Sequence, residues 1–109
     1  MSNNAPCMIH TTCPGTESAE TLADELIARK LAACVSIGSP VTSRYPWQGR
    51  VETDREVPLT IKTMTTRVAA VQRLVDEVHP YEVPEFLVVP VSDGSPAYLA
   101  WLGESVDAN

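Results

Sequence analysis

The chain has 109 residues, of which 44% are hydrophobic and 20% are charged, and its formal net charge is −6 at pH 7. That length fits a single domain with a hydrophobic core of its own. The acidic balance argues against a nucleic-acid-binding surface, because neutralising phosphates requires clustered Lys and Arg side chains.

The first part of the chain predicts a strand followed by a helix. We expect the strand over residues 7–13, closed by the breakers Pro14 and Gly15. The helix should begin with Thr16 as its N-cap and carry apolar residues at three- and four-residue steps on one face. These apolar residues are Leu22, Ala23, Leu26, Ile27 and Leu31.

The middle of the chain predicts a long β-hairpin. An alternating strand should begin near Cys34, break or kink at 38–40 and continue over 41–47. A tight reversal at 48–49 then starts the return strand. Pro58 falls inside this return strand, although proline cannot donate to a β-ladder and prefers edges or bulges.

The last part of the chain predicts a helix, a strand and a short terminal helix. The threonines at 65–66 offer an N-cap for a helix whose apolar positions run over 68–78. The continuous apolar run at 86–91 is typical of a short strand buried on both sides. Ser95 followed by Pro96 is a strong helix start.

The order of these elements predicts an α+β fold. Two split βαβ units imply a ferredoxin-like βαββαβ arrangement, with a four-stranded antiparallel sheet and helices on one face. We expect one domain over 1–109, with an extended hairpin and with residues 1–6 as a flexible N-terminal tail. This fold hosts many unrelated functions, so it does not identify one.

The cysteines and the chain start predict the compartment. Cys7, Cys13 and Cys34 form an odd set without zinc-like pairing, which favours reduced thiols in a cytosol over disulfides. The first four residues lack the charged start and apolar centre of a signal peptide. The longest apolar runs, 31–35 and 86–91, are far shorter than the ~20 residues of a membrane span. We therefore expect a cytoplasmic protein without membrane insertion.

Two segments carry residues suited to binding a ligand. His10 and Cys13 lie where metal chaperones of the same fold hold their ion, but a strand would point them to opposite faces. The segment 79–85 packs an imidazole, a phenol and two carboxylates between stiffening prolines. That set suits a metal ion or an oxygen-rich ligand; the alternative is a rigid connection with His79 near a helix C-terminus.

The hairpin and its surroundings suggest no catalysis. Tyr45 and Trp47 at the tip are exposed unless another surface covers them or the tip folds back on its own domain. The charged stretch 52–56 is expected to be a solvated strand face. No nucleophile motif, glycine-rich phosphate loop or His-Glu-x-x-His motif occurs, so we expect no enzyme and no required cofactor.

Five motifs in order carry a family resemblance. They are Leu31-Ala32-Ala33-Cys34-Val35, Tyr45-x-Trp47-x-Gly49, Ile61-Lys62-Thr63, His79-Pro80-Tyr81-Glu82-Val83-Pro84-Glu85, and Pro90-Val91 with Tyr98-Leu99-x-Trp101-Leu102. From about Met8 to Ser105 the chain resembles the CutA divalent-cation tolerance proteins. The resemblance implies a ferredoxin-like homotrimer, related in architecture to the PII signalling proteins. It also implies a cytoplasmic, non-enzymatic protein linked to tolerance of copper and other divalent ions.

The resemblance also suggests metal ligands. Residues proposed to bind copper in the family fall on His79 and Glu85. A cysteine found in some members would fall at Thr11, so a thiolate ligand is missing there unless Cys13 replaces it from two residues away. Cu(II) or another divalent ion would then be a ligand of the protein.

Three functions remain open from the sequence. The first is a trimeric, metal-responsive binding protein. The second is a PII-like sensor that binds a small anionic metabolite in clefts between subunits, lined by Lys62, Tyr81 and Glu82. For these residues the plain alternative is a surface pair between Lys62 and Glu82. The third is a scaffold for partner proteins.

The long hairpin predicts self-association. Its strands are about twice the usual ~5–6 residues, so the tip around Tyr45 and Trp47 should project and expose unpaired backbone and aromatic surface. Three arms, each adding its edge to the next subunit's sheet, would close into a ring. A twofold dimer would also cover the arms; the number three comes from the resemblance.

Overall fold

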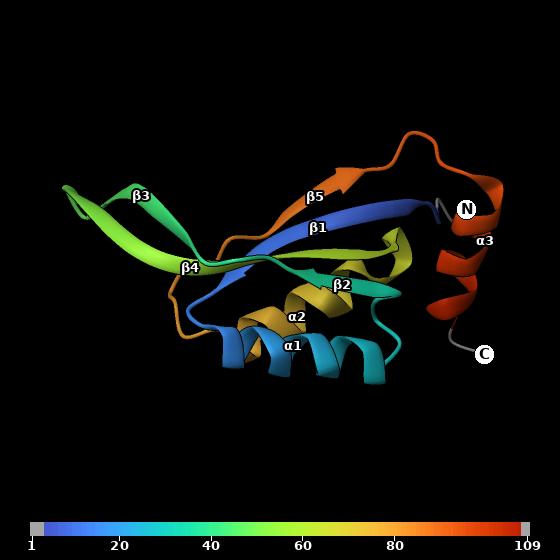
Figure 1. Cartoon of the computed structure of the whole chain (residues 1–109), viewed down its shortest axis with the longest axis horizontal. Helices are drawn as coiled ribbons and strands as arrows, with labels where there is room; N and C mark the ends of the chain where they lie inside the picture. Colours follow the sequence, from blue (N-terminus) through green and yellow to red (C-terminus); the bar gives the residue numbers. More distant parts are fainter. Residues whose placement is uncertain (1–3, 108–109) are drawn as a thin grey trace.

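The computed structural model describes residues 4–107 and contains one antiparallel sheet with three α-helices (Figure 1). The α+β class predicted from the sequence is confirmed. In chain order the elements are β1 Pro6–Cys13, α1 Thr16–Ala28, β2 Cys34–Ile37, β3 Val41–Trp47, β4 Arg50–Met64, the 3-10 helix η1 Thr65–Arg67, α2 Val68–Val78, β5 Leu87–Pro90 and α3 Pro96–Ser105.

The long strand β4 organises the sheet. The strand order is β2-β4-β1-β5, and β3 pairs with the far half of β4. Ile61 of β4 stands opposite both Ile9 of β1 and Val35 of β2. The strand predicted as one interrupted segment is therefore two, β2 and β3, which pair in succession along the same edge of β4.

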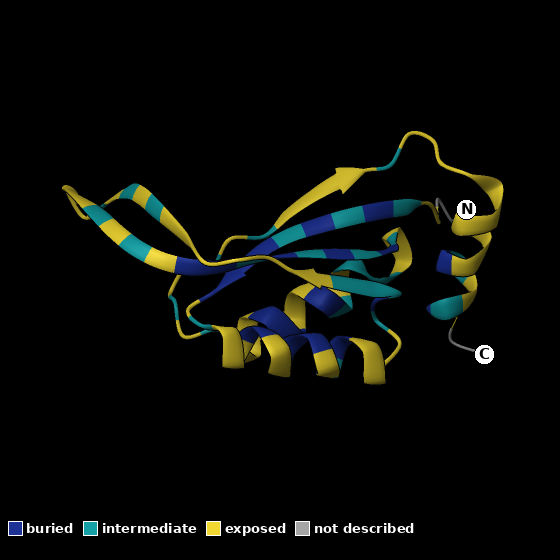
Figure 2. Cartoon of the chain, viewed as in Figure 1, coloured by how far each residue is buried: buried dark blue, intermediate teal, exposed yellow. Residues whose placement is uncertain are grey.

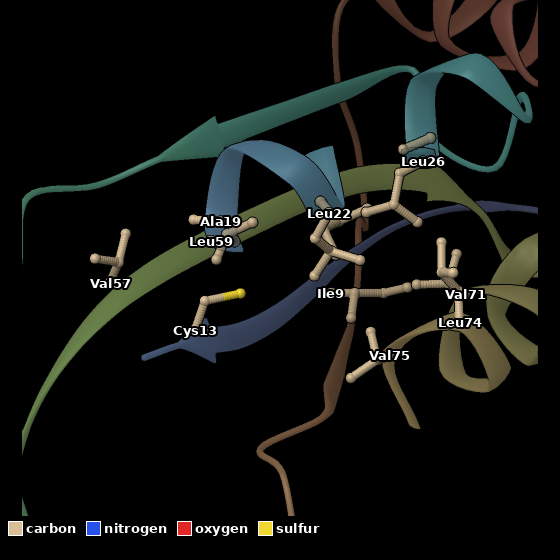
Figure 3. Packing of buried hydrophobic residues seen from close by; sticks show 12 residues of the cluster. Ile9, Cys13, Ala19, Leu22, Leu26, Val57, Leu59, Val71, Leu74 and Val75 are labelled. Atoms are coloured by element: carbon tan, nitrogen blue, oxygen red, sulfur yellow. The ribbon is translucent and has the colours of Figure 1, made fainter. Parts of the chain in front are cut away.

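The core fills the space between one face of the sheet and helices α1 and α2, which lie side by side on that face (Figure 1). Figure 3 shows side chains of strands β1 and β4 meeting side chains of helices α1 and α2 there. Alternate residues of β1 and β4 point to this face, as the period of a strand requires. The sheet contributes Ile9, Cys13, Val57, Leu59 and Ile61, and the helices contribute Ala19, Leu22, Leu26, Val71, Leu74 and Val75.

The β3–β4 hairpin extends as an arm beyond the sheet, as predicted (Figure 1). Gln48 and Gly49 at its tip both have positive φ, 51° and 78°, which a two-residue type I′ reversal needs. The arm contributes to an elongated chain of 44 × 25 × 25 Å. Its radius of gyration is 14.7 Å, against about 13 Å for a compact domain of this length.

Pro58 sits where β2 ends and β3 begins. The carbonyl of Pro58 accepts a hydrogen bond from the Gly38 amide, 2.9 Å away, so its nitrogen faces the same side. β2 stops opposite Leu59 and β3 starts opposite Glu56, which leaves no ladder partner for that nitrogen. The N–H that proline lacks would therefore point at the gap between β2 and β3, where no hydrogen bond is lost. For this reason the central strand β4 can contain a proline.

Ser95 is the N-cap of α3, as predicted, but the two other predicted helix caps need correction. Gly15, not Thr16, is the N-cap of α1, and Thr16 is its first helical residue. The hydroxyl of Thr65 accepts a hydrogen bond from the Ala5 amide, and that of Thr66 donates to the Asn4 side chain. These threonines hold the N-terminal segment, and α2 begins after one 3-10 turn.

Residues 4–6 are held to the rest of the chain. Pro6 already belongs to β1, and the Ala5 carbonyl accepts a hydrogen bond from the Thr65 amide. The prediction of a flexible tail is therefore wrong for residues 4–6, and its residues 1–3 lie outside the described residues.

The prediction that the last strand is buried on both sides is wrong. β5 pairs only with β1, which makes it an edge strand, and all four of its residues are exposed (Figure 2). Leu87 alone has 59% of its surface accessible. An exposed apolar edge strand is unfavourable for an isolated chain, because it offers unpaired backbone groups and apolar side chains together.

Candidate functional site

A pocket of about 600 Å³ lies where the arm joins the body of the molecule. β1 and β4 contribute Thr12 and Glu56, the arm strand β3 contributes residues 43–45 and Trp47, and the loop before β5 contributes residues 81–85. The structure therefore brings together Tyr45, Trp47, Tyr81, Glu82 and Glu85, which the sequence placed in three separate predictions.

Glu56 is a buried carboxylate of this pocket, with only 8% of its surface exposed. One carboxylate oxygen, Oε2, accepts a hydrogen bond of 2.9 Å from the Thr12 hydroxyl. The expectation that 52–56 forms a solvated strand face is therefore wrong at Glu56. The alternation of Glu52, Asp54 and Glu56 on one face of the return strand was the available signal, but the sequence does not show what that face meets.

Two tyrosines of the pocket have raised pKa values, in part because of the negative charge around them. The pKa of Tyr45 is raised to about 12, first because its hydroxyl donates to the Asp54 carboxylate and further by burial and nearby negative charge. Burial raises the pKa of Tyr81, and the charges of Glu56 and Asp54 raise it further. Both phenols therefore stay neutral donors at neutral pH.

Tyr45 should titrate far above an ordinary tyrosine. With a pKa of about 12 it should be only about 10% ionised at pH 11, where a free tyrosine is about 90% ionised. Because the folded pKa exceeds the ordinary value, the Tyr45–Asp54 hydrogen bond should be intact below pH 10 and be lost as the pH rises through 12. Absorbance at 295 nm, compared with Tyr45→Phe, measures this step. Asp54→Asn should move it back toward 10; an unchanged step would contradict the assignment.

His79 begins the loop before β5 with both ring nitrogens engaged. Nε2 donates to the Thr12 carbonyl at 2.7 Å, since a carbonyl can only accept, and Nδ1 accepts from the Tyr81 amide at 3.1 Å. The Tyr81 ring packs edge-on, 4.5 Å away between centroids. Through these contacts the imidazole links β1 to the loop.

The three predicted metal ligands do not share one pocket. Cys13 and His79 line a second hollow of about 270 Å³, between the start of α1 and the end of α2. Glu85 lines the first pocket instead, and its carbonyl accepts a hydrogen bond from Thr11. Burial raises the pKa of the Cys13 thiol, which disfavours the thiolate that a metal requires. Within residues 4–107 no three His, Cys, Asp or Glu side chains are placed to hold an ion.

His10 and Cys13 lie on opposite faces of β1, as predicted. Cys13 belongs to the core cluster, whereas Nδ1 of His10 lies 3.4 Å from the Thr60 hydroxyl on the other face. The two side chains therefore cannot clasp one ion.

Lys62 lies away from Tyr81 and Glu82 within one chain. It stands opposite Met8 of β1, whereas the pocket begins at Thr12, four residues farther along that strand. Its ammonium lies 6.0 Å from the centre of the Tyr98 ring of α3. The three residues therefore do not line a common cleft within one chain, and the cleft between subunits stays a prediction.

Comparison with known proteins identifies the family. The profile described as CutA1 divalent ion tolerance protein matches residues 7–105. The chain belongs to the CutA1 divalent ion tolerance family. The resemblance inferred from the five motifs is thereby confirmed.

The relatives of this CutA1 chain include bacterial and vertebrate proteins. The divalent-cation tolerance protein CutA of Escherichia coli is 38% identical over 105 residues, which are 96% of this chain and 94% of that protein. The CutA homolog of Xenopus laevis is 45% identical over 97 residues, 89% of this chain and 64% of that protein. Mouse protein CutA is matched over 55% of its length. The chain thus spans less than two thirds of these two vertebrate relatives.

Solved structures share the fold of this CutA1 chain. CutA1 from Oryza sativa superposes with a TM-score of 0.91 at 38% identity, covering 99% of this chain and 100% of that one. The protein described as periplasmic divalent cation tolerance protein CutA from Archaeoglobus fulgidus gives 0.91 at 34% identity, covering 94% and 99%. None of these names describes an enzymatic activity. Between residues 4 and 107, no helix is both long and apolar enough to cross a membrane.

Proposed function

We propose that the chain is a non-catalytic, homotrimeric binding protein for copper and other divalent ions, acting in the cytoplasm in the response to metal ions. The family match over residues 7–105 carries this proposal. The strand order β2-β4-β1-β5, with α1 and α2 on one face, supports a ferredoxin-like arrangement. Three free cysteines, two of them buried, support a reducing compartment.

The metal site of this proposal uses His79, with Glu85 and Cys13 as further ligands. Nδ1 of His79 accepts a hydrogen bond from the Tyr81 amide. An ion that binds this nitrogen must break that hydrogen bond, at a cost of about 1 kcal/mol. The buried Cys13 thiol must also lose a proton and become accessible. Both requirements favour weak, pH-dependent copper binding.

Replacing His79 should identify its part in copper binding. In calorimetric titrations with Cu(II), His79→Ala should weaken binding by roughly tenfold, because imidazole nitrogen is the best copper donor of the proposed set. Affinity of the parent should fall as the solution is acidified, since protonated imidazole cannot coordinate. His10→Ala is the matched control, because His10 lies on the opposite face of β1. Unchanged copper affinity in His79→Ala would remove His79 from the site.

Preference for copper over zinc does not by itself show physiological selectivity. Nitrogen and oxygen sites generally bind Cu(II) more tightly than Zn(II). A titration series with Cu(II), Zn(II) and a panel of nucleotides therefore tests the function best. Heat changes with nucleotides alone would instead support the PII-like alternative.

The anionic-metabolite alternative has less support. It requires Lys62 of one subunit to face Tyr81 and Glu82 of another, because one chain keeps them apart. Glu56, Glu82 and Glu85 line the pocket beside Tyr81 and would repel an anion. We therefore place the metal function first.

Trimer formation is supported by two incompletely covered features. The arm presents Tyr45 and Trp47, which are half-buried. Strand β5 is exposed (Figure 2) and leaves one edge without a strand neighbour within residues 4–107. Adding a strand of another copy to a free edge would satisfy its backbone groups. Cyclic closure of such contacts removes all free edges at once.

Trp47→Ala should weaken assembly more than it weakens the fold. Light scattering of the parent at micromolar concentration should give three times the 11.8 kDa chain mass. The variant should lose about 2 kcal/mol of association free energy, since aromatic anchors carry much of an interface's energy. Arg55→Ala, an exposed change on the same arm, is the control. A parent that scatters as a single chain would overturn the trimer.

A further inference from the structure

The pocket at the base of the arm combines aromatic rings with a buried carboxylate. We propose that this pocket binds an organic cation of the alkylammonium or guanidinium class, with Glu56 as counter-ion and Tyr45, Trp47 and Tyr81 as the aromatic wall. Of the proposed metal ligands, His79 and Cys13 line the other hollow, whereas Glu85 lines this pocket.

The register of the arm places acids and aromatics on one face. Ser43 stands opposite Asp54, and Tyr45 stands opposite Glu52. Residues directly opposite one another in an antiparallel pair share a face, and every second residue returns to it. The face that carries Tyr45 and Trp47 therefore also carries the alternating acids of β4, the last of which is Glu56.

Glu56 has no cationic partner within the described part of the chain. The two ion pairs found there join Arg29 to Glu25 and Arg50 to Glu52. The hydrogen bond that Glu56 accepts comes from the neutral Thr12 hydroxyl. Burying a carboxylate without a counter-charge is costly, so a bound cation would be favoured here over bulk water.

The aromatic residues suit a cation rather than a neutral ligand. A cation within about 6 Å of a ring face is attracted by the ring quadrupole, and Trp and Tyr are the best partners. Three such residues line the pocket. The pKa of Tyr81, raised by burial and further by Glu56 and Asp54, is consistent with negative potential at this wall.

The remaining lining residues leave the pocket acidic. The lining includes three acids, Glu56, Glu82 and Glu85, and a single basic residue, Arg44, which is exposed. The volume of about 600 Å³ lies within the range of small-molecule sites. No cluster of three His, Cys, Asp or Glu within residues 4–107 is placed for a metal ion, which favours an organic cation over an inorganic one.

The fluorescence of Trp47 provides a direct test. The chain has two tryptophans, so Trp101→Phe leaves Trp47 as the single reporter. The assembled full-length protein is titrated with agmatine and putrescine in buffer containing EDTA, and 1,4-butanediol serves as the neutral match for putrescine. Both amines should change the emission saturably and butanediol should not.

Substitutions assign the response to the pocket. Glu56→Gln keeps an acceptor for Thr12 but removes the charge, and should weaken amine binding about tenfold or more. Glu20→Gln changes the net charge equally on an exposed face of α1 and should leave binding unchanged. If circular dichroism shows that Glu56→Gln does not fold, Tyr81→Leu is used in its place. Tyr81→Leu should weaken amine binding by about threefold or more.

Three results would overturn the proposal. The first is no saturable response to either amine, as expected if a basic side chain of another copy fills the pocket. The second is an equal response to butanediol. The third is undiminished binding in Glu56→Gln, or in Tyr81→Leu where it is used instead. Because the amine titrations are made in EDTA, their result does not depend on a bound metal ion, so failure of the metal site and failure of this site are distinguishable.

Discussion

Ile61→Ala should lower the free energy of unfolding by about 2–5 kcal/mol. Ile61 is fully buried near the C-terminal end of β4, where it stands between Ile9 and Val35. Removing three carbons there loses buried apolar contact and leaves a cavity that the surrounding sheet and helices fill only in part. Urea unfolding followed by circular dichroism measures the change.

A matched control separates core packing from strand propensity. Val51→Ala changes another residue of β4, but Val51 is 76% exposed on the arm, so the cost should stay within about 0.5 kcal/mol. Both variants must be compared with the parent at several protein concentrations, because assembly contributes to apparent stability. Equal losses in the two variants would contradict the assignment of the core to this end of β4.

Leu87→Lys should dissociate the assembly while leaving the chain folded. Leu87 is the first residue of the edge strand β5 and is 59% exposed in the single chain. If another copy covers this edge, an ammonium group is placed in an apolar contact, which should raise the dissociation constant about tenfold or more. Light scattering across a concentration series measures the loss, and far-UV circular dichroism checks the fold.

Ile27→Lys is the control for this second substitution. Ile27 is also an exposed apolar residue, at 46%, but it lies on α1, away from the edge strand. The Ile27→Lys substitution should leave the mass of the assembly unchanged. Dissociation by Ile27→Lys instead of Leu87→Lys would move the interface to the helical layer.

Local chemistry decided the order of the elements, and the sequence predicts it well. The period of two in β4, the three- and four-residue steps in α1 and α2, and the reversal at Gln48 and Gly49 each depend on neighbouring residues alone. The arm was predictable for the same reason, because its length exceeds what a sheet of ordinary width covers. Family membership also followed from the order of short motifs.

Burial of single residues depended on what each strand meets across space. The run before Pro90 is continuously apolar, as in a central strand, yet β5 lies at an edge because only β1 pairs with it. Glu56 belongs to a charged stretch, yet it is buried beside the Thr12 side chain of β1, in a pocket that the loop before β5 also lines. Composition cannot distinguish these cases, since the neighbours come from distant parts of the chain.

The candidate site shows the same division between sequence and tertiary structure. The sequence by itself identified the chemically rich segment 79–85 and the aromatics Tyr45 and Trp47. Only the tertiary structure shows that this segment lies beside the arm and that both ring nitrogens of His79 are hydrogen-bonded. It also shows that Lys62 lies far along the sheet from Tyr81. The physical reason is that strand register and loop closure, which set these distances, come from packing across the whole sheet.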